Sequence, residues 1–187
     1  RFLYSIVLLS FLGFAQQKSA DSLMQVLGKT KNDIDKTNLL NAISDSYKVV
    51  DPKKMFVFGN QALDLAKKIN YTIAQGNAYL NLGNSKIIEG DYKAATNYFQ
   101  QAQEIFENES STPNTKDQIA SGLAKSYGSI GIVLSEQSNY AKALQFYLKS
   151  VKIYEKLDDQ VRCAKLYNNI GVIYKSQKSD FKALEFF

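Results

Sequence analysis

The sequence predicts an all-α fold, built as an array of antiparallel helix hairpins. Apolar residues recur at three- and four-residue spacing over long stretches, with almost no alternating β-branched runs, which is the pattern of amphipathic helices. Only two prolines are present to interrupt them. One set of residues also recurs at fixed offsets from Gly83, Gly131 and Gly171, so we interpret these helices as copies of a repeat unit.

The repeat is defined by residue types that keep a constant distance from each glycine. A tyrosine comes four residues before it, Leu or Ile one before, Ala twelve after, an aromatic residue sixteen after and a small residue nineteen after. These positions are Tyr79, Leu82, Gly83, Ala95, Phe99, Ala102, Tyr127, Ile130, Gly131, Ala143, Tyr147, Ser150, Tyr167, Ile170, Gly171, Ala183 and Phe187. Because a glycine inside a helix costs about 1 kcal/mol relative to alanine, we expect close helix packing at Gly and Ala, with the aromatic rings filling the volume beside them.

The N-terminal residues are typical of a secretory signal peptide. Arg1 precedes an apolar run from Phe2 to Ala15, which is shorter than the roughly 20 residues of a transmembrane helix. We therefore predict a signal peptide at residues 1–15 and an exported protein, periplasmic or membrane-associated with this region extracytoplasmic. A buried N-terminal helix is the alternative.

The predicted helices follow in pairs. Residues 16–34 form a helical lead-in with a short helix at 22–27, and Asp35 can cap the first helix of the array. That helix ends at Asp51-Pro52, where Pro52 suits the first turn of the next one. The array covers 35–187, with hairpins at about 35–70, 71–108, 116–157 and 160–187, the last one truncated. A loop rich in Ser, Thr, Asn and Pro separates the second and third hairpins at 109–115.

One stretch has the form Tyr79-x-x-Leu82-Gly83 followed by Gly90-Asp91-Tyr92-x-x-Ala95-x-x-x-Phe99-x-x-Ala102. It resembles the tetratricopeptide repeat family, and the resemblance covers residue 71 to the end well and 35–70 more weakly. It departs from the family pattern at Met55, Lys86, Ser150 and Asp180. The glycines are 48 and 40 residues apart, against about 34 for the minimal repeat, so longer helices are expected. The resemblance implies a right-handed α-solenoid that acts as a protein- or peptide-binding scaffold.

A second resemblance concerns the whole chain. The Leu39-Leu40-Asn41 helix, the Asp-Pro turn and the apolar N-terminus are similar to the exported sensor portions of bacterial signalling proteins. There the repeats precede a transmembrane helix and a histidine kinase, cyclase or DNA-binding output, which implies a sensing or interaction region of a longer protein. The chain stops midway through a helix, so we expect further sequence to follow. Two alternatives stay open: a segment that dimerises or positions a downstream kinase or cyclase, and a free-standing periplasmic assembly factor.

The composition argues against a catalytic or metal site within this chain. It has no histidine, which removes Ser-His, Cys-His and His-metal arrangements, and no phosphate loop or nucleophile motif is present. We expect no enzyme activity, cofactor or metal here. The carboxylate pairs Asp33/Asp35 and Asp158/Asp159 lie near helix starts, where capping explains them, and Cys163 is expected to be a small core residue. The net charge of +5 comes from dispersed lysines, so nucleic acid is not an expected partner, and a membrane is one only through a span further on.

The candidate binding residues follow from the family resemblance, in which the first helices of successive hairpins line a concave groove. The residues that lie off the packing stripe of those helices are Asn77, Asn81, Asn84, Ile88, Lys125, Ser129, Ile132, Lys165, Asn168, Asn169 and Val172. Amide side chains can pair with an extended peptide backbone, and the two lysines can receive a carboxylate. Ordinary solvated helix surface is the alternative for each of them.

Overall fold

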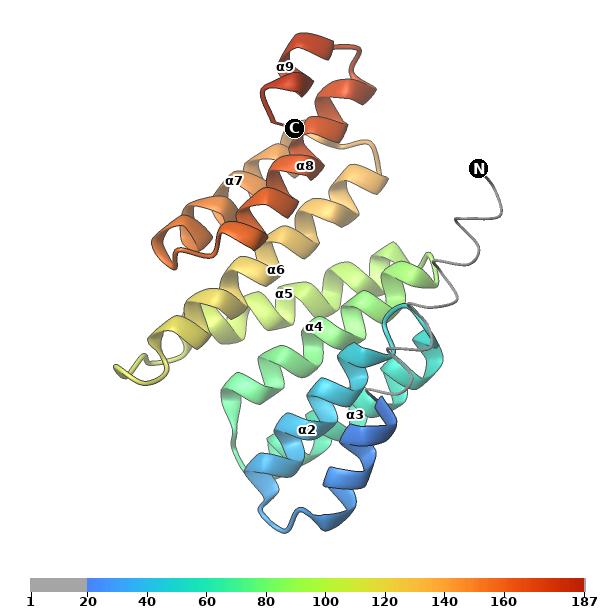
Figure 1. The fold of residues 1–187 in the computed structure, drawn as a ribbon, viewed down its shortest axis with the longest axis vertical. Coiled ribbons are helices and arrows are strands. Elements are labelled where there is room, and N and C mark those ends of the chain that lie inside the picture. The colour runs from blue at the N-terminus through green and yellow to red at the C-terminus, as the bar shows by residue number, and fades with distance from the viewer. Residues whose placement is uncertain (1–19, 187) are drawn as a thin grey trace. The chain divides into compact units, whose positions relative to one another are not determined.

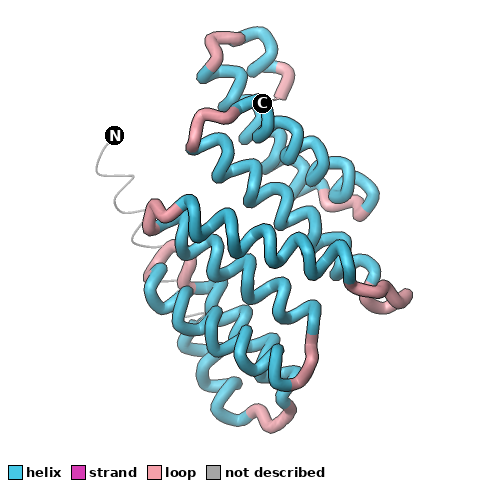
Figure 2. The backbone as a smooth tube through the Cα atoms, turned by 180° about the vertical axis from the view of Figure 1, so that it is seen from behind, coloured by secondary structure: helices cyan, strands magenta, loops and turns pink. Residues whose placement is uncertain are grey.

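The computed structural model describes residues 20–186, and all regular structure within that range is helical (Figures 1 and 2). This confirms the all-α prediction. A first helical segment covers 20–29. The helices that follow are α2 (Asp33–Ser46), α3 (Pro52–Lys68), α4 (Thr72–Ile88), α5 (Tyr92–Asn108), α6 (Lys116–Glu136), α7 (Tyr140–Lys156), α8 (Gln160–Ser176) and α9 (Asp180–Leu184). The predicted signal peptide and Phe187 lie outside the described residues.

The helices divide into two compact units, one ending at Asp91 and one beginning at Tyr92. In unit one, α3 packs against both α2 and α4, and α2 also packs against α4. In unit two each helix from α5 to α9 packs against the next, and α6 also contacts α8. Within each unit, therefore, the first helices of two successive hairpins touch, as stacked hairpins require. The predicted hairpin 71–108 spans the boundary between the units.

The core of unit one is closed at its N-terminal side by the segment 20–29. Ala20 is fully buried there, in a cluster with Ile43, Tyr47 and Met55. The apolar residues Leu23, Met24 and Leu27 of the same segment pack against that cluster. The lead-in predicted from sequence thus supplies the apolar face that the first hairpin would otherwise expose.

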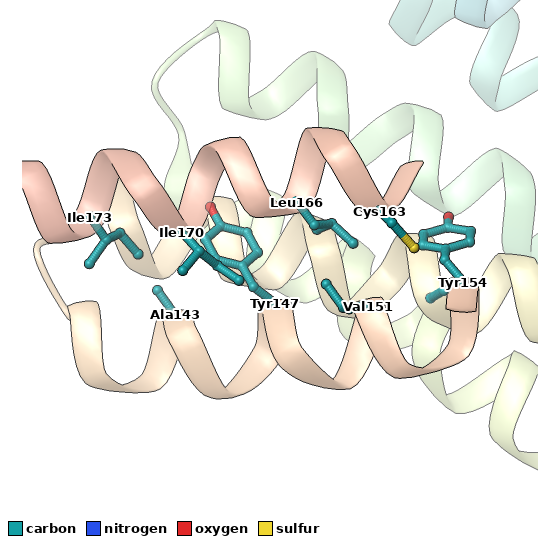
Figure 3. Close-up of a cluster of buried hydrophobic side chains, with 9 residues drawn as sticks. Ala143, Tyr147, Val151, Tyr154, Cys163, Leu166, Ile170 and Ile173 are labelled. Carbon is teal, nitrogen blue, oxygen red and sulfur yellow. The ribbon is translucent and has the colours of Figure 1, made fainter. Parts of the chain in front are cut away.

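The core of unit two lies mainly between α7 and α8 (Figure 3). Tyr147, Val151 and Tyr154 of α7 meet Leu166, Ile170 and other side chains of α8, and all of these are buried. Cys163 is 3% exposed in the same cluster, which confirms that it is a core residue. Burial raises the pKa of its thiol, so the reactive thiolate is disfavoured.

The glycine of the repeat makes room for an aromatic ring rather than for the alanine. A Cβ placed on Gly131 would lie 2.6 Å from ring carbons of Tyr147, well inside van der Waals contact. The expected close packing is present, and its partner is the aromatic residue sixteen positions later. Among the repeat positions that the structure describes, Tyr127 and Tyr167 are only half-buried, and the others with an apolar or glycine side chain are buried.

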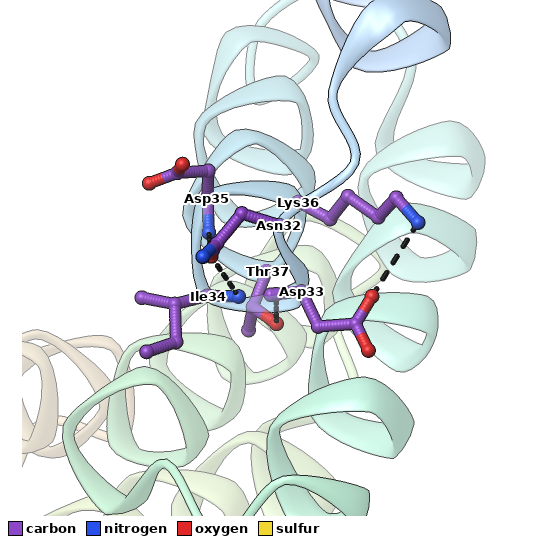
Figure 4. A network of polar contacts seen from close by, with 6 residues as sticks. All are labelled: Asn32, Asp33, Ile34, Asp35, Lys36 and Thr37. Atoms are coloured by element: carbon purple, nitrogen blue, oxygen red, sulfur yellow. Dashed lines mark hydrogen bonds and ion pairs between the residues drawn. The ribbon is translucent and has the colours of Figure 1, made fainter.

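Helix caps differ in one place from the expectation. The N-cap of α2 is Asn32, whose Oδ1 accepts hydrogen bonds from the backbone N–H groups of Ile34 and Asp35 (Figure 4). The prediction that Asp35 is the cap was therefore wrong, because Asn32 has the side chain at the geometrically correct position two and three residues before those donors. Asp33 and Asp35 lie in the first turn instead, where they favour the positive end of the helix dipole.

At the other carboxylate pair, the capping interpretation is confirmed for Asp159 and not for Asp158. Asp159 is the N-cap of α8 and accepts from the backbone N–H of Arg162 at 3.0 Å. That hydrogen bond, together with the Arg162 guanidinium, holds the pKa of Asp159 below its usual value. Asp158 has a different role, since it adopts the left-handed conformation in the turn before α8.

Candidate functional site

In unit two the candidate residues form matching stripes on α6 and α8, two helices that touch. Each stripe has a lysine six residues before the repeat glycine, a hydroxyl or amide two before it, and an aliphatic residue one after it. On α6 these are Lys125, Ser129 and Ile132. On α8 they are Lys165, Asn169 and Val172. Spacings of four and three residues place all three on one side of a helix.

The two stripes differ in how far they reach into solvent. On α6, Lys125 is exposed, whereas Ser129 and Ile132 are half-buried and Ile132 packs against the unit-two core. On α8, Lys165 and Asn168 are exposed and Asn169 is half-buried. Val172 is 49% exposed, whereas its counterpart Ile132 packs against the core. The stripe on α8 is therefore the more accessible of the two.

In unit one the candidates on α4 are mostly amides, and one of them is committed to packing. Asn81 is 7% exposed, and its Nδ2 donates to the backbone carbonyl of Asn41 on α2 at 3.0 Å. Asn41 in turn donates from Nδ2 to the carbonyl of Ala74 on α4 at 3.1 Å. Asn77 and Asn84 are half-buried, and Ile88 is 46% exposed. Asn81 has little surface left for a ligand, because its side chain joins the first helices α2 and α4.

Sequence reasoning missed a pair of tyrosine–glutamate contacts, one between α5 and α6 and one between α7 and α8. Tyr127 on α6 donates its hydroxyl hydrogen to Glu107 on α5 at 2.9 Å, and Tyr167 on α8 donates to Glu155 on α7 at 2.9 Å. Burial, followed by the Glu107 carboxylate, raises the pKa of Tyr127 to about 12. Both tyrosines are repeat positions, so a glutamate near the end of each preceding helix was the available signal. Each contact ties a hairpin to the one before it.

Residues 20–186 were also compared with the requirements of a metal site and of a membrane span. No cluster of His, Cys, Asp or Glu within that range has a composition suited to a metal ion. A search of the same range for membrane spans finds no helix with the length and apolarity to cross a bilayer.

Stacked hairpins, side-by-side first helices and a repeated surface stripe define an α-helical repeat protein. Two family models, both described as the tetratricopeptide repeat, match the chain at residues 76–109 and 122–187. The chain therefore contains tetratricopeptide repeats, as the sequence pattern indicated. Neither model describes a catalytic family. A search of curated protein sequences gave no match.

Solved structures share the fold at low sequence identity. A Rap protein complexed with Competence and Sporulation Factor aligns with a TM-score of 0.77 and 17% identity over 94% of this chain and 50% of that one. Aspartyl phosphate phosphatase F from Bacillus subtilis aligns with a TM-score of 0.72 and 18% identity, over 98% and 50%. BtubC from P. vanneervenii gives 0.66 and 16%, over 95% and 70%. The chain thus spans about half the length of the first two proteins, and these likenesses concern the fold alone.

Proposed function

We propose that the chain is a protein- or peptide-binding scaffold, and that the stripes on α6 and α8 form its binding surface. The observation that carries this proposal is the repetition of lysine, hydrogen-bonding side chain and aliphatic residue, in the same order, on two touching helices. Packing accounts for Ile132, which contacts the unit-two core, but Lys125 and Lys165 are exposed and Val172 is 49% exposed.

The order of the side chains suits an extended peptide. Lys125 and Ile132 are seven residues apart, which is about 10.5 Å along a helix, and an extended peptide covers that distance in about three residues. Ser129 and Asn169 lie between the two ends and can hydrogen-bond a peptide backbone. The surface would favour a peptide with a carboxylate near the lysines and an apolar side chain near Ile132 and Val172.

The similar structures lend support of a limited kind. The Rap protein that shares this fold was solved in a complex with Competence and Sporulation Factor. A helical-repeat fold of this type is therefore compatible with holding another molecule, although the identity of 17% transfers no partner to this chain.

The test is a selection of peptides from a random display library on the purified chain. Selected peptides should be enriched in acidic residues and should lose at least about tenfold in affinity for the variant Lys125→Glu with Lys165→Glu. The matched control is Lys53→Glu with Lys68→Glu, which makes the same change of charge at exposed positions of α3 and should bind normally. Equal binding by all three proteins, with circular dichroism showing intact helices, would exclude the α6 and α8 surface.

We also propose that this region acts outside the cytoplasm as the sensing or interaction part of a longer signalling protein. The apolar run from Phe2 to Ala15 supports export. Fusing residues 1–30 to an alkaline phosphatase that is active only after export should give activity, and Leu8→Arg with Leu9→Arg should abolish it. Activity unaffected by those charges would count against export. The parent reading frame then separates a kinase or cyclase that this region positions from a free-standing assembly factor.

A further inference from the structure

A stripe of lysines runs along α7, away from the candidate peptide surface. Lys142, Lys149, Lys152 and Lys156 are all exposed, and Gln145 is exposed between the first two. At about 100° per residue these positions fall within about 80° of the helix circumference and extend for about 21 Å. With Glu155 as the only acidic residue of α7, the helix has a charge of +3, against +5 for the whole chain.

None of these lysines forms an ion pair with a carboxylate whose side chain the structure describes. The ion pairs found between described side chains lie elsewhere, at Lys36–Asp33, Lys86–Glu89 and Arg162–Asp159. Lys149 is instead placed over aromatic rings, with Nζ 5.4 Å from the centre of Tyr127 and 5.2 Å from that of Phe146. The cation is fixed in position there while its charge remains available to a partner.

Two glutamates lie near residues of the stripe. Tyr127, the ring below Lys149, donates its hydroxyl hydrogen to Glu107 of α5. Glu155, three residues after Lys152 on α7, accepts a hydrogen bond from Tyr167 of α8. A broad anionic surface such as a membrane would bring its phosphates close to both carboxylates, which is unfavourable. A partner as narrow as one helix meets the lysines and avoids the glutamates.

We propose that the α7 stripe is a second docking surface, which binds an acidic α-helix of a protein partner. The exposed positions 142, 145, 149, 152 and 156 alternate in steps of three and four residues, the spacing of a helix seam that faces a second helix. Carboxylates at the same spacing on the partner would face the lysines along its length. Leu148, 53% exposed beside the stripe, offers an apolar contact at its edge. This surface does not depend on peptide binding by α6 and α8.

A designed helical peptide tests the proposal directly. The probe is an alanine-based peptide of about 21 residues, long enough to be helical, with glutamates at alternating three- and four-residue spacing and a fluorophore at one end. Fluorescence anisotropy with the full chain should detect binding at about 50 mM salt that weakens several-fold at about 200 mM. The triple variant Lys142→Glu, Lys152→Glu and Lys156→Glu should bind at least about tenfold more weakly. Lys149 is kept, so that its contacts with Tyr127 and Phe146 remain.

Three controls decide the outcome. Lys48→Glu, Lys53→Glu and Lys68→Glu change the net charge equally at exposed positions of unit one, and should leave binding within about twofold. A peptide of the same composition with its glutamates spread around the helix should bind clearly more weakly. Vesicles containing phosphatidylserine should not bind. Equal losses in both triple variants, equal binding of both peptides, or vesicle binding without peptide binding would each overturn the proposal, and circular dichroism and thermal melting confirm that the variants are folded.

Discussion

In the two units, the small residue at the contact between paired helices lies on different helices of the hairpin. In unit two the first helix supplies Gly131 and the second supplies the ring of Tyr147 that fills the space. In unit one the first helix has Ser44 at the glycine position and the second has Gly59, whose added Cβ would lie 3.0 Å from Leu82 Cδ2 of α4 and 3.3 Å from Ser44 Oγ. Gly59 therefore makes room for a side chain of the following helix as well as for Ser44.

A second exchange accompanies the first. Met55, fully buried, occupies in unit one the place of the small residue that is Ala143 in unit two. Ser44 donates its hydroxyl hydrogen to the Met55 carbonyl at 2.7 Å, which satisfies a buried polar group. The departure at Met55 that weakened the family resemblance in this hairpin is thus balanced by Gly59, where the other repeats have an aromatic residue.

The surfaces of the units differ more freely than their cores. The first helix α4 presents amides, of which Asn81 is tied to α2, whereas α6 and α8 present lysines and aliphatic residues. Both sets also contribute to packing, Asn81 through its bond to α2 and Ile132 through its contact with the unit-two core. The exposed lysines of α6 and α8 have no counterpart among the α4 candidates.

The largest effect is expected where unit one departs from the repeat. Met55→Ala removes a fully buried side chain whose volume Gly59 does not replace, and should lower the free energy of unfolding by about 2 to 5 kcal/mol. Urea unfolding followed by circular dichroism measures it. Met55→Leu keeps the volume and should cost less than about 1.5 kcal/mol. A loss below 1 kcal/mol in the alanine variant would contradict the volume exchange.

The corresponding change in unit two adds volume. Gly131→Leu forces the ring of Tyr147 aside and should cost about 1 to 3 kcal/mol, visible as a lower thermal midpoint. Gly28→Leu is the matched control, because an added Cβ there meets nothing within 4 Å, and it should be neutral or stabilising. An unchanged midpoint in the Gly131 variant would show that the ring relocates at little cost.

The core positions could be predicted from the sequence because the same residue types recur at the same offsets in three copies of the repeat. Gly131, Ala143 and Ile170 are buried as expected, and the helices follow from their apolar spacing. The surface was less predictable. Asn81 bonds a carbonyl 40 residues earlier in the chain, and this contact depends on how α2 and α4 pack rather than on any local pattern.

The same limit applies to the helix cap and the tyrosine contacts. Asn32, Asp33 and Asp35 all have capping side chains, and only the backbone conformation selects Asn32. Tyr127 was predicted to fill core volume, yet its hydroxyl reaches Glu107, which lies 24 residues after Gly83 just as Glu155 lies 24 residues after Gly131. Periodicity was enough to identify the positions that lie off the packing stripe. Their exposure and their hydrogen-bond partners could be determined only from the structure.

We expect alkaline pH to lower the stability of unit two through its buried tyrosines. Burial raises the pKa of Tyr147 from 10.0 to about 12 in the folded chain. The contribution of the neutral Tyr147 side chain to the stability of the fold is therefore complete below pH 10 and is lost as the pH rises through 12. At pH 11 the loss should be about 1 kcal/mol. Tyr147→Phe cannot ionise, so its thermal midpoint should fall less between pH 8 and pH 11 than that of the wild type. Parallel falls in both proteins would indicate that Tyr147 ionises freely.

The smallest effects concern the turns, in which the units again differ. Gly90 ends α4 in unit one with φ of 78°, and Ser138 ends α6 in unit two with φ of 60°. In both turns the next residue donates its N–H to a carbonyl of the last helical turn, Asp91 to Lys86 at 2.9 Å and Asn139 to Leu134 at 2.8 Å. Only glycine adopts this conformation without a steric penalty.

Removing the glycine from one turn and adding a glycine to the other should therefore change the stability of the protein in opposite directions. Gly90→Ala should cost about 1 kcal/mol through backbone strain alone, since an added Cβ would meet no atom within 4 Å. Ser138→Gly should gain about 0.5 kcal/mol, because relief of strain outweighs the added freedom of the unfolded chain. Asp158→Gly should gain less, because aspartate tolerates the left-handed region better than serine does. Thermal midpoints of the three variants test this order, and a loss of stability in Ser138→Gly would mean that the unfolded-state entropy dominates at these turns.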